Sequence, residues 1–303
     1  MLDQKDKKIL YELELDSRQS LSQLGKKTLL KKETLFHRIK NLEKEIIHSY
    51  ITEINIYKLG YIYYPILIKL SNITKTKEEK LISYLKNHPQ TAWLTICEGN
   101  WNINLTLVSK SISEIKEFLN GLEEKFGKYI PEKNIFITSE ITYLKKAFSL
   151  NKEKQQVTFK SETPSVITDK ELKLLRILST NARMPLIEIS KKLQTSPKNI
   201  AYSIKKLEKQ KIITGSRIQT SFPETKYYKI WISTKENPEL IKFLRTQEQI
   251  IWITKLIGKY DLSIELEITK EQELLDIINK IKTFKIKNYE LIQIFNEIKI
   301  KYF

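Results

Sequence analysis

Two segments of the chain carry residues that suit contacts with the bases and phosphates of nucleic acid. Residues 191–211 hold seven lysines against the single acid Glu208, and residues 25–40 hold five lysines and Arg38 against Glu33. Lysine and arginine pair with phosphates, while asparagine, arginine and hydroxyl groups hydrogen-bond to base edges. The candidate DNA contacts are Lys32, Glu33, His37, Arg38 and Lys40 in the first segment, and Ser196, Lys198, Asn199, Tyr202 and Lys206 in the second.

The second segment divides into the two faces that a recognition helix needs. Ser196 suits the N-cap and Pro197 the first helical position. Ile200, Ile204 and Leu207 then recur at helical spacing on the side opposite the candidate contacts. One side of such a helix anchors in its domain and the other reaches the major groove. A solvated lysine-rich face is the alternative interpretation, and His37 could equally be a surface histidine without a role.

Both segments belong to a longer internal repeat. Residues 6–47 match residues 171–212 without a gap, and Asp16 aligns with Asn181 at an offset of 165 residues. The apolar positions Leu10, Leu13, Leu21, Leu35, Ile39 and Leu42 meet Leu175, Leu178, Leu186, Ile200, Ile204 and Leu207. A recurrence this regular indicates one unit of three short helices, used twice. Asp3 is the expected cap of the first helix, and Lys31 is a poor cap for the third.

After each helical unit the pattern changes to strands and helices in alternation. An extended wing is expected at 51–56. Strands are then expected at 61–70, 93–97, 101–108 and 134–142, with helices at 75–87 and 111–126, and the corresponding second set is 227–233, 250–256, 260–268 and 291–301 with helices at 238–246 and 271–283. The order βαββαβ is that of the ferredoxin-like unit.

The predicted fold class is therefore α+β, with two tandem copies of a winged helix-turn-helix domain followed by a ferredoxin-like βαββαβ domain for dimerisation and ligand binding. The predicted segments are 1–54 (helix-turn-helix), 55–145 (ferredoxin-like), 146–166 (linker), 167–220 (helix-turn-helix) and 221–303 (ferredoxin-like).

Composition narrows the function. The chain has 303 residues, 41% of them hydrophobic, so it can form real cores, and its net charge of +17 favours a polyanionic partner. Lysine abundance from an AT-rich genome is the alternative source of that charge. The single cysteine, Cys97, suggests a reducing compartment, and no apolar run resembles a signal peptide or a membrane span. We expect a soluble cytoplasmic protein without a membrane partner.

In this order the motifs resemble the Lrp/AsnC (feast/famine) family of transcriptional regulators. The matching stretches are residues 2–10, the turn at 16–18, residues 35–43, the strand opening at 59–61 and the hairpin turns at 99–102 and 258–261. The resemblance implies a sequence-specific regulator that binds double-stranded DNA, dimerises through its αβ domain and often senses amino acids. Two units in one chain imply a covalent pseudo-dimer, with a higher homo-oligomer left open.

The resemblance also implies a place for an amino-acid effector. It places Gly99, Asn102, Gly258 and Asp261 at the ligand-facing hairpin turns. Asp261 could hold an amino group, whereas Asn102 offers a neutral acceptor. The alternative is that these are ordinary turn residues. The family's frequent paired arginines appear here as His37-Arg38 and Tyr202-Ser203, so the two halves need not read the same DNA sequence.

Two other functions are alternatives to that of a regulator. Sirohaem decarboxylases resemble this family and can be built from paired halves, but His88 is the only histidine in either ferredoxin-like segment. The sequence has no Ser-His-Asp set, no glycine-rich phosphate loop and no metal-ligand cluster, so we predict no enzyme activity, no metal and no cofactor. An architectural DNA-compacting protein has the same charge signature and stays open.

Overall fold

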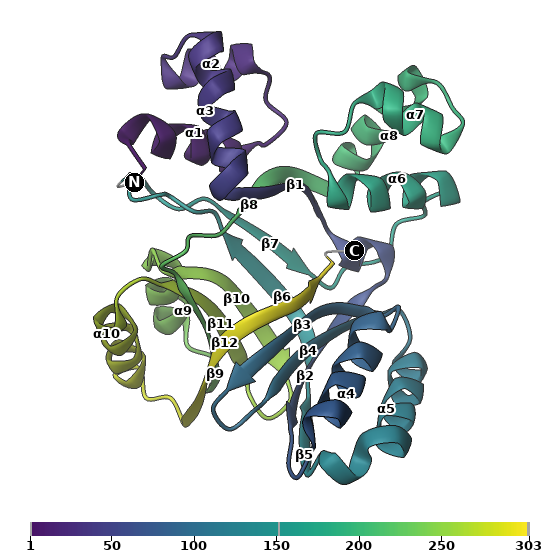
Figure 1. Ribbon diagram of the computed structural model, residues 1–303, viewed down its shortest axis with the longest axis vertical. Coiled ribbons are helices and arrows are strands. Elements are labelled where there is room, and N and C mark those ends of the chain that lie inside the picture. Colours follow the sequence, from purple (N-terminus) through teal and green to yellow (C-terminus); the bar gives the residue numbers. More distant parts are fainter. Residues whose placement is uncertain (1, 151, 302–303) are drawn as a thin grey trace.

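The helical units gather at one end of the molecule, above a β-rich body (Figure 1). This arrangement is that of a computed structural model, which describes residues 2–150 and 152–301. The first unit contains α1 (Gln4–Leu15), α2 (Leu21–Thr28) and α3 (Lys32–Glu45), and the second contains α6 (Asp169–Thr180), α7 (Leu186–Leu193) and α8 (Pro197–Lys209). The fold is α+β with helix-turn-helix and ferredoxin-type domains, as predicted.

Local capping explains where several of these helices begin. The Asp3 carboxylate accepts a hydrogen bond from the Asp6 N–H at 2.8 Å, and the Ser196 hydroxyl accepts one from the Asn199 N–H at 3.2 Å. Each bond satisfies a backbone donor that the first helical turn leaves without a partner. By contrast, α3 follows Lys31 without a side-chain cap. All three features agree with the sequence predictions.

The wing strands of the two units pair with each other. Strand β1 (Ile47–Ile54) runs antiparallel to β8 (Ile213–Thr220), with Tyr50 opposite Ile218. The wing predicted at 51–56 lies too far toward the C-terminus. The strand already begins at Ile47, which packs in the core of the first unit, and residues 56–59 form a 3-10 turn, η1 (Ile56–Leu59). The paired wings form one ribbon beneath both helical units.

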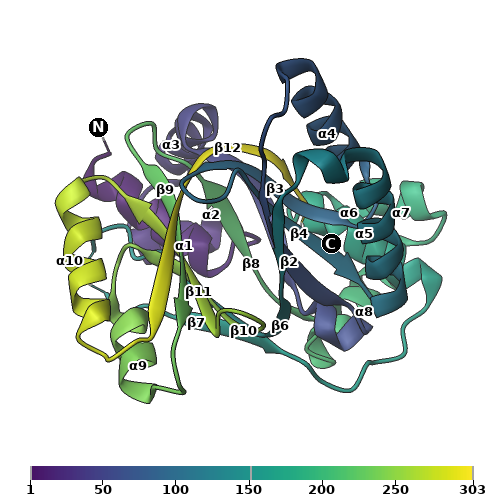
Figure 2. The same cartoon turned by 90° about the horizontal axis from the view of Figure 1, so that it is seen from below.

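The body contains two sets of elements in the order βαββαβ. The first set is β2 (Ile62–Lys69), α4 (Lys75–Asn87), β3 (Thr91–Glu98), β4 (Ile103–Ser109), α5 (Ile112–Phe126), η2 (Gly127–Tyr129), β5 (Glu132–Ile135) and β6 (Ile137–Leu144); the second is β9 (Lys226–Ser233), α9 (Pro238–Thr246), β10 (Ile250–Ile257), β11 (Leu262–Ile268), α10 (Glu271–Lys282) and β12 (Asn288–Ile300). The four helices lie on the outer flanks, two on each side (Figure 2), and an aliphatic core fills the space beneath each pair.

The last strand of each set crosses into the other set. Strand β12 pairs first with β9 and then, from Gln293 to Ile300, with β3. The strand predicted at 134–142 is divided at Phe136: β5 pairs with β2 of its own set, whereas β6 pairs with β10. The strand order β5-β2-β4-β3-β12-β9-β11-β10-β6-β7, in which β7 is Gln156–Lys160, therefore begins and ends with strands that follow one another in sequence. This crossing explains why the predicted strand is divided at Phe136, because the chain changes its strand partner there from β2 to β10.

Residues 146–166, predicted as a linker, include a strand. Strand β7 (Gln156–Lys160) pairs with β6, with Phe159 opposite Ile141. The side chain of Phe159 is buried, which gives this short, otherwise polar segment an anchor. The prediction missed β7 because a five-residue strand with a single apolar anchor has no sustained period.

An aromatic cluster packs in the interior of the body where the crossing strands meet. Phe136 stacks on Trp231 with ring centroids 4.6 Å apart, and Trp101 and Tyr260 complete the cluster together with Cys97. Trp231 and Phe136 are completely buried. The two sets of strands therefore share a core as well as backbone hydrogen bonds.

Residues 1–145 alone should not form a monomer. Cutting after residue 145 removes β12, β10 and β7, so β3 keeps only β4 as a partner and β6 loses both strands that pair with it. Exposed strand edges pair with other chains, and the fragment should self-associate or aggregate in size-exclusion chromatography with light scattering. The full chain at the same concentration is the control. A folded, monomeric fragment would contradict the strand exchange as a requirement for a closed body.

Candidate nucleic-acid interface and central cavity

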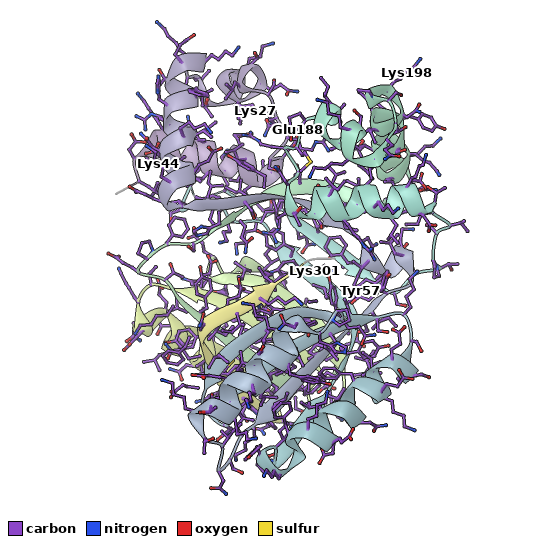
Figure 3. All side chains as sticks on the ribbon, turned by 45° about the vertical axis from the view of Figure 1, so that its right-hand side comes forward. Lys27, Lys44, Tyr57, Glu188, Lys198 and Lys301 are labelled. Atoms are coloured by element: carbon purple, nitrogen blue, oxygen red, sulfur yellow. The ribbon has the colours of Figure 1, made fainter. Side chains whose placement is uncertain are left out.

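The two candidate recognition helices, α3 and α8, lie at the same end of the molecule in separate units (Figure 1). Lys198 lies at the tip of the second unit, far from the body, and Lys44 lies on the outer side of the first (Figure 3). The exposed predicted contacts are Lys32, Glu33, His37, Lys40, Ser196, Lys198, Asn199 and Tyr202. Both helices thus offer polar and basic groups to a ligand outside the chain.

Arg38 differs from the other predicted contacts because it holds the first unit together. Its guanidinium pairs with Asp3 at 2.8 Å and with Asp6 at 2.7 Å, which ties α3 to the start of α1. The backbone N–H of Asp6, together with this guanidinium, lowers the pKa of the Asp3 carboxyl. Lys40 similarly pairs with Glu43 at 2.8 Å. Arg38 is consequently positioned by its own domain, and a DNA role for it stays a prediction.

In the second unit one lysine is also engaged internally. Lys206 pairs with Glu171 at 2.7 Å and so ties α8 to α6. Asn199 donates from its side-chain amide to the Thr195 hydroxyl at 3.2 Å and remains exposed. Tyr202 is 70% exposed. Lys198, Asn199 and Tyr202 are therefore the side chains of α8 that could reach a groove without breaking an ion pair.

A large cavity lies between the wing ribbon and the inner face of the sheet. Its volume is about 780 Å³, within the usual range for small-molecule sites. Tyr57 and Lys301, which both line it, lie between the helical units and the body (Figure 3). The aromatic lining consists of Tyr57, Tyr63, Trp93, Tyr143, Phe159, Tyr227, Tyr228, Trp252 and Phe295.

The charged groups in this cavity are mostly held in pairs. Lys146 pairs with Glu267 at 2.5 Å, and Lys229 pairs with Glu265 at 2.9 Å. Glu297 accepts a hydrogen bond from the Trp93 indole at 2.9 Å, and burial raises the pKa of its carboxyl. Buried charges are tolerated when they are paired in this way. The walls can therefore offer both donors and acceptors to a ligand while their aromatic faces supply apolar contact.

Arg217 joins the cavity to the wing ribbon. Its guanidinium lies 4.2 Å from the centroid of the Tyr143 ring and 5.6 Å from that of Trp252. Such stacking holds an arginine in place and leaves its edge for hydrogen bonds. Only 6% of the residue is exposed, and its Nε lies 4.0 Å from the Glu53 carboxylate. Arg217 is thus a buried cation against an aromatic wall.

The hairpin residues predicted to bind an effector lie elsewhere. A Cβ on Gly258 would come within 2.7 Å of the Phe136 ring, and one on Gly99 would come within 3.1 Å of the Leu291 carbonyl. Phe136 and Leu291 belong to the segments that cross between the two sets of strands, so both glycines make room for close approach. Their φ angles of 152° and 127° also favour glycine.

The polar side chains beside these glycines bond to nearby backbone. Asn102 accepts from the Leu70 N–H at 2.7 Å, and Asp261 accepts from the Thr234 N–H at 2.8 Å. Each carbonyl or carboxylate oxygen thereby fixes the end of the adjacent strand. These contacts give all four hairpin residues a structural role, and an effector role for them stays a prediction.

Sequence reasoning missed the cavity residues. The available signal was the presence of charged residues inside otherwise apolar strands. Lys229 in β9 and Glu265 in β11 are an example, and they lie directly opposite each other on neighbouring strands. Arg217 carried no comparable local signal. Its place in the cavity follows from the pairing of the two wings, which lie far apart in sequence.

The histidines give no sign of a metal centre. His48 contacts the Ser221 hydroxyl, and His88 packs against Phe118, with centroids 4.7 Å apart. Burial lowers the pKa of His88. Across residues 2–150 and 152–301, no group of three or more His, Cys, Asp or Glu side chains is arranged to hold a metal ion. Within the same residues, no helix has the length and apolarity needed to cross a membrane.

Sequence comparisons relate each half of the chain to known regulators. Residues 2–43 match the AsnC-type helix-turn-helix domain, and residues 167–214 match a winged helix-turn-helix DNA-binding domain. An HTH-type transcriptional regulator of Pyrococcus furiosus is 31% identical over 129 residues, which are 42% of this chain and 84% of that protein. The regulator LrpC of Bacillus subtilis is 30% identical over 121 residues, 39% of this chain and 82% of LrpC.

Structural comparison finds a likeness over the whole chain. Two crystal structures of the siroheme decarboxylase NirDL superpose with a TM-score of 0.68. In one the matched region covers 99% of this chain and 94% of NirDL, at 17% identity. In the other, a complex with an iron-uroporphyrin III analogue, it covers 98% and 93%, at 16% identity. At that identity the likeness establishes a shared fold.

Replacing Glu14 should change how stability depends on pH. Glu14 is fully buried, and burial raises the pKa of its carboxyl above the ordinary value of 4.5. Between the ordinary pKa of the unfolded state and the raised pKa of the folded state, the folded state binds more protons than the unfolded state. The free energy of unfolding therefore falls as pH rises through this window. Glu14→Gln removes this contribution.

We therefore expect the stability of Glu14→Gln relative to the native chain to increase as pH rises above about 4.5, the ordinary pKa of this carboxyl. Urea unfolding at a series of pH values measures it. Glu45→Gln, at the exposed end of α3, is the control and should show no such trend. A Glu14→Gln curve parallel to that of the native chain would show that the buried carboxyl does not titrate in this window.

Proposed function

The chain belongs to the Lrp/AsnC family of helix-turn-helix transcriptional regulators, and we propose that it binds double-stranded DNA as a covalent pseudo-dimer. The observation that carries this proposal is the wing ribbon, in which β1 of the first unit pairs with β8 of the second. Both helical units are thereby fixed to one support and present α3 and α8 at the same end. A regulator dimer places two recognition helices on DNA in a comparable way.

The extent of the family match supports the pseudo-dimer. The Pyrococcus furiosus relative corresponds over 84% of its length to only 42% of this chain, so one relative is equivalent to about half of it. The internal repeat supplies the other half. We infer that the crossing strands replace the contacts that two separate subunits would otherwise make.

Direct contact with bases is assigned to the exposed side chains of α3 and α8. In α8, Asn199 is suited to read a base edge, and Lys198 to bind a phosphate. In α3, His37 occupies the position equivalent to Tyr202, so the two halves would prefer different half-sites. An amino-acid effector at the hairpin turns remains a prediction, because Asp261 would have to exchange its backbone partner for the ligand.

The affinity for DNA should depend mainly on lysine contacts with phosphates, and the sequence preference on side chains of the recognition helices. Lys198→Ala should weaken binding to every duplex and reduce the slope of log K against log salt by about 0.9. Asn199→Ala should instead relax the preference at particular base pairs, at a cost of about 1–3 kcal/mol. Fluorescence anisotropy at several salt concentrations and selection of bound sequences measure the two effects.

Lys80→Ala, on the outer face of α4, is the matched control for charge. It should leave the affinity and the salt slope near those of the native chain. Affinity for duplex DNA that does not change with salt, or no binding at all, would overturn the regulator function.

The second candidate function is that of a tetrapyrrole-binding enzyme resembling siroheme decarboxylase. One observation favours it: the central cavity of about 780 Å³ has aromatic walls suited to a planar ring, and its lining includes the cationic side chains of Arg217, Lys146 and Lys301, which carboxylates would attract. The full-length likeness to NirDL supports the same reading of the fold. Under this function the macrocycle is the substrate.

Titration with iron-uroporphyrin III discriminates this candidate. A binding enzyme should shift the absorption band of the macrocycle at one equivalent, and Arg217→Gln should weaken the binding by about tenfold, the cost of losing a charge-assisted contact. An unchanged spectrum at micromolar protein would exclude the tetrapyrrole function and leave DNA binding unaffected.

A further inference from the structure

The first helical unit is docked on the body through a buried polar contact at the end of α1. Glu14, in the last turn of α1, has no exposed surface. Its carboxylate accepts a hydrogen bond from the Tyr143 hydroxyl and a longer one, 3.4 Å, from the Lys146 N–H. Tyr143 is itself 2% exposed and lies in β6, a wall of the central cavity. A side chain that lines the cavity therefore bonds directly to a helix of the DNA-binding unit.

Lys145 strengthens the same contact. Its ammonium donates to the carbonyls of Glu14 at 3.1 Å and Leu15 at 3.4 Å, and to the Glu53 carboxylate at 3.0 Å. Those carbonyls lie at the C-terminus of α1, where a cation is favourable, and the last turn of α1 has no basic residue of its own. Lys145, which directly follows β6, supplies the missing charge. The position of α1 is thus set by groups that belong to the body.

The cavity side of this contact contains three groups in mutual contact. The Tyr143 ring lies 4.2 Å from the Arg217 guanidinium and 4.6 Å from the tilted Trp252 ring, and the guanidinium lies 5.6 Å from Trp252. A ligand that stacks on Trp252 or pairs with Arg217 must alter the surroundings of Tyr143, because both groups are in direct contact with its ring. The hydroxyl at the other end of that ring is the one bonded to Glu14.

The second helical unit has no counterpart to this contact within the described residues. Ser179 occupies in α6 the position that Glu14 has in α1, and its hydroxyl donates to the Arg176 carbonyl of its own helix at 2.9 Å. Thr52 is the repeat equivalent of Arg217. Each unit also rests on the wing strand of the other: the Ala182 N–H donates to the Tyr50 carbonyl at 2.7 Å, and the Ser17 N–H donates to the Ser216 carbonyl at 3.2 Å. Among the described residues, the polar connection to the cavity is therefore found in the first unit alone.

We propose that Glu14, Tyr143, Lys145 and Arg217 form a one-sided latch that couples an aromatic anion in the central cavity to the docking of α1. An aromatic ring matches the stacking surface of Trp252 and Tyr143, and an anionic group matches the Arg217 guanidinium. Binding changes the environment of Tyr143 and with it the contact to Glu14. Because Arg38 ties α3 to α1, the first recognition helix moves with α1, and α8 is not affected.

The effect of this coupling on DNA rests on the proposed function, but the coupling itself does not. A ligand shifts a conformational equilibrium only by its difference in affinity for the two states. Here that difference arises because a bound anion competes with Tyr143 and Glu53 for Arg217. The latch can therefore be tested without DNA, so its failure is distinguishable from a failure of DNA binding.

The test uses the full chain and anilinonaphthalene sulfonate, a fluorescent aromatic anion. Fluorescence titration should give one site per chain, and Thr254→Trp, which fills the cavity, should weaken binding by at least about fivefold. Arg217→Gln is the second variant and should weaken it similarly without adding volume. If both variants bind the probe as the native chain does, the cavity is not the site and the proposal is wrong.

Hydrogen exchange measured by mass spectrometry then tests the latch. With the probe bound, peptides from α1 should change their exchange rate by at least about threefold, whereas peptides from α6 should not change. Tyr143→Phe keeps the ring and removes only the hydroxyl, so at a probe concentration that saturates it, as measured by its own titration, it should lose the α1 response. Equal responses in both helices, no response in either, or an unaltered α1 response in Tyr143→Phe would each overturn the one-sided latch.

Discussion

The need of every strand to satisfy its backbone hydrogen bonds governs this structure. Without the crossing strands, β3 and β10 would each present an unpaired edge, and such edges are costly when buried and prone to association when exposed. Strand β12 covers β3, and β6 covers β10, so each set of strands is completed by the other. The relative position of the two ferredoxin-type sets, and of the wing ribbon above them, follows from this exchange.

The same exchange creates the cavity and determines its chemistry. The crossing strands join the two sets into one sheet whose inner face lines the cavity, and Phe136 and Trp231 pack together where the sets meet. Polar side chains that point into the enclosed space must find partners there, which accounts for pairs such as Lys229 with Glu265. The cavity walls consequently combine paired charges with aromatic rings, as expected of a small-molecule site.

Much of the local structure could be predicted from the sequence, and the long-range pairing could not. The helices of both units follow from apolar spacing and from caps such as Asp3 and Ser196, which act within four residues. The pairing of β1 with β8 joins residues about 165 positions apart and leaves no periodic signal. The division of one predicted strand at Phe136 and the place of Arg217 in the cavity depend on such distant partners. The exposed contacts on α3 and α8 could be named because helical spacing alone decides which face they occupy.

Because the two halves lie in one chain, they can carry different residues at equivalent positions. In a homodimer every residue occurs on both sides of the axis, so a contact made by one subunit is repeated by the other. Here the two copies differ at the positions that matter: Glu14 is matched by Ser179, Arg217 by Thr52, and His37 by Tyr202. The differences fall on the docking of the helical units and on the exposed faces of α3 and α8, whereas the apolar positions of the repeat are retained. A shared core with divergent polar positions is what we expect when both halves must fold alike but act on different surroundings.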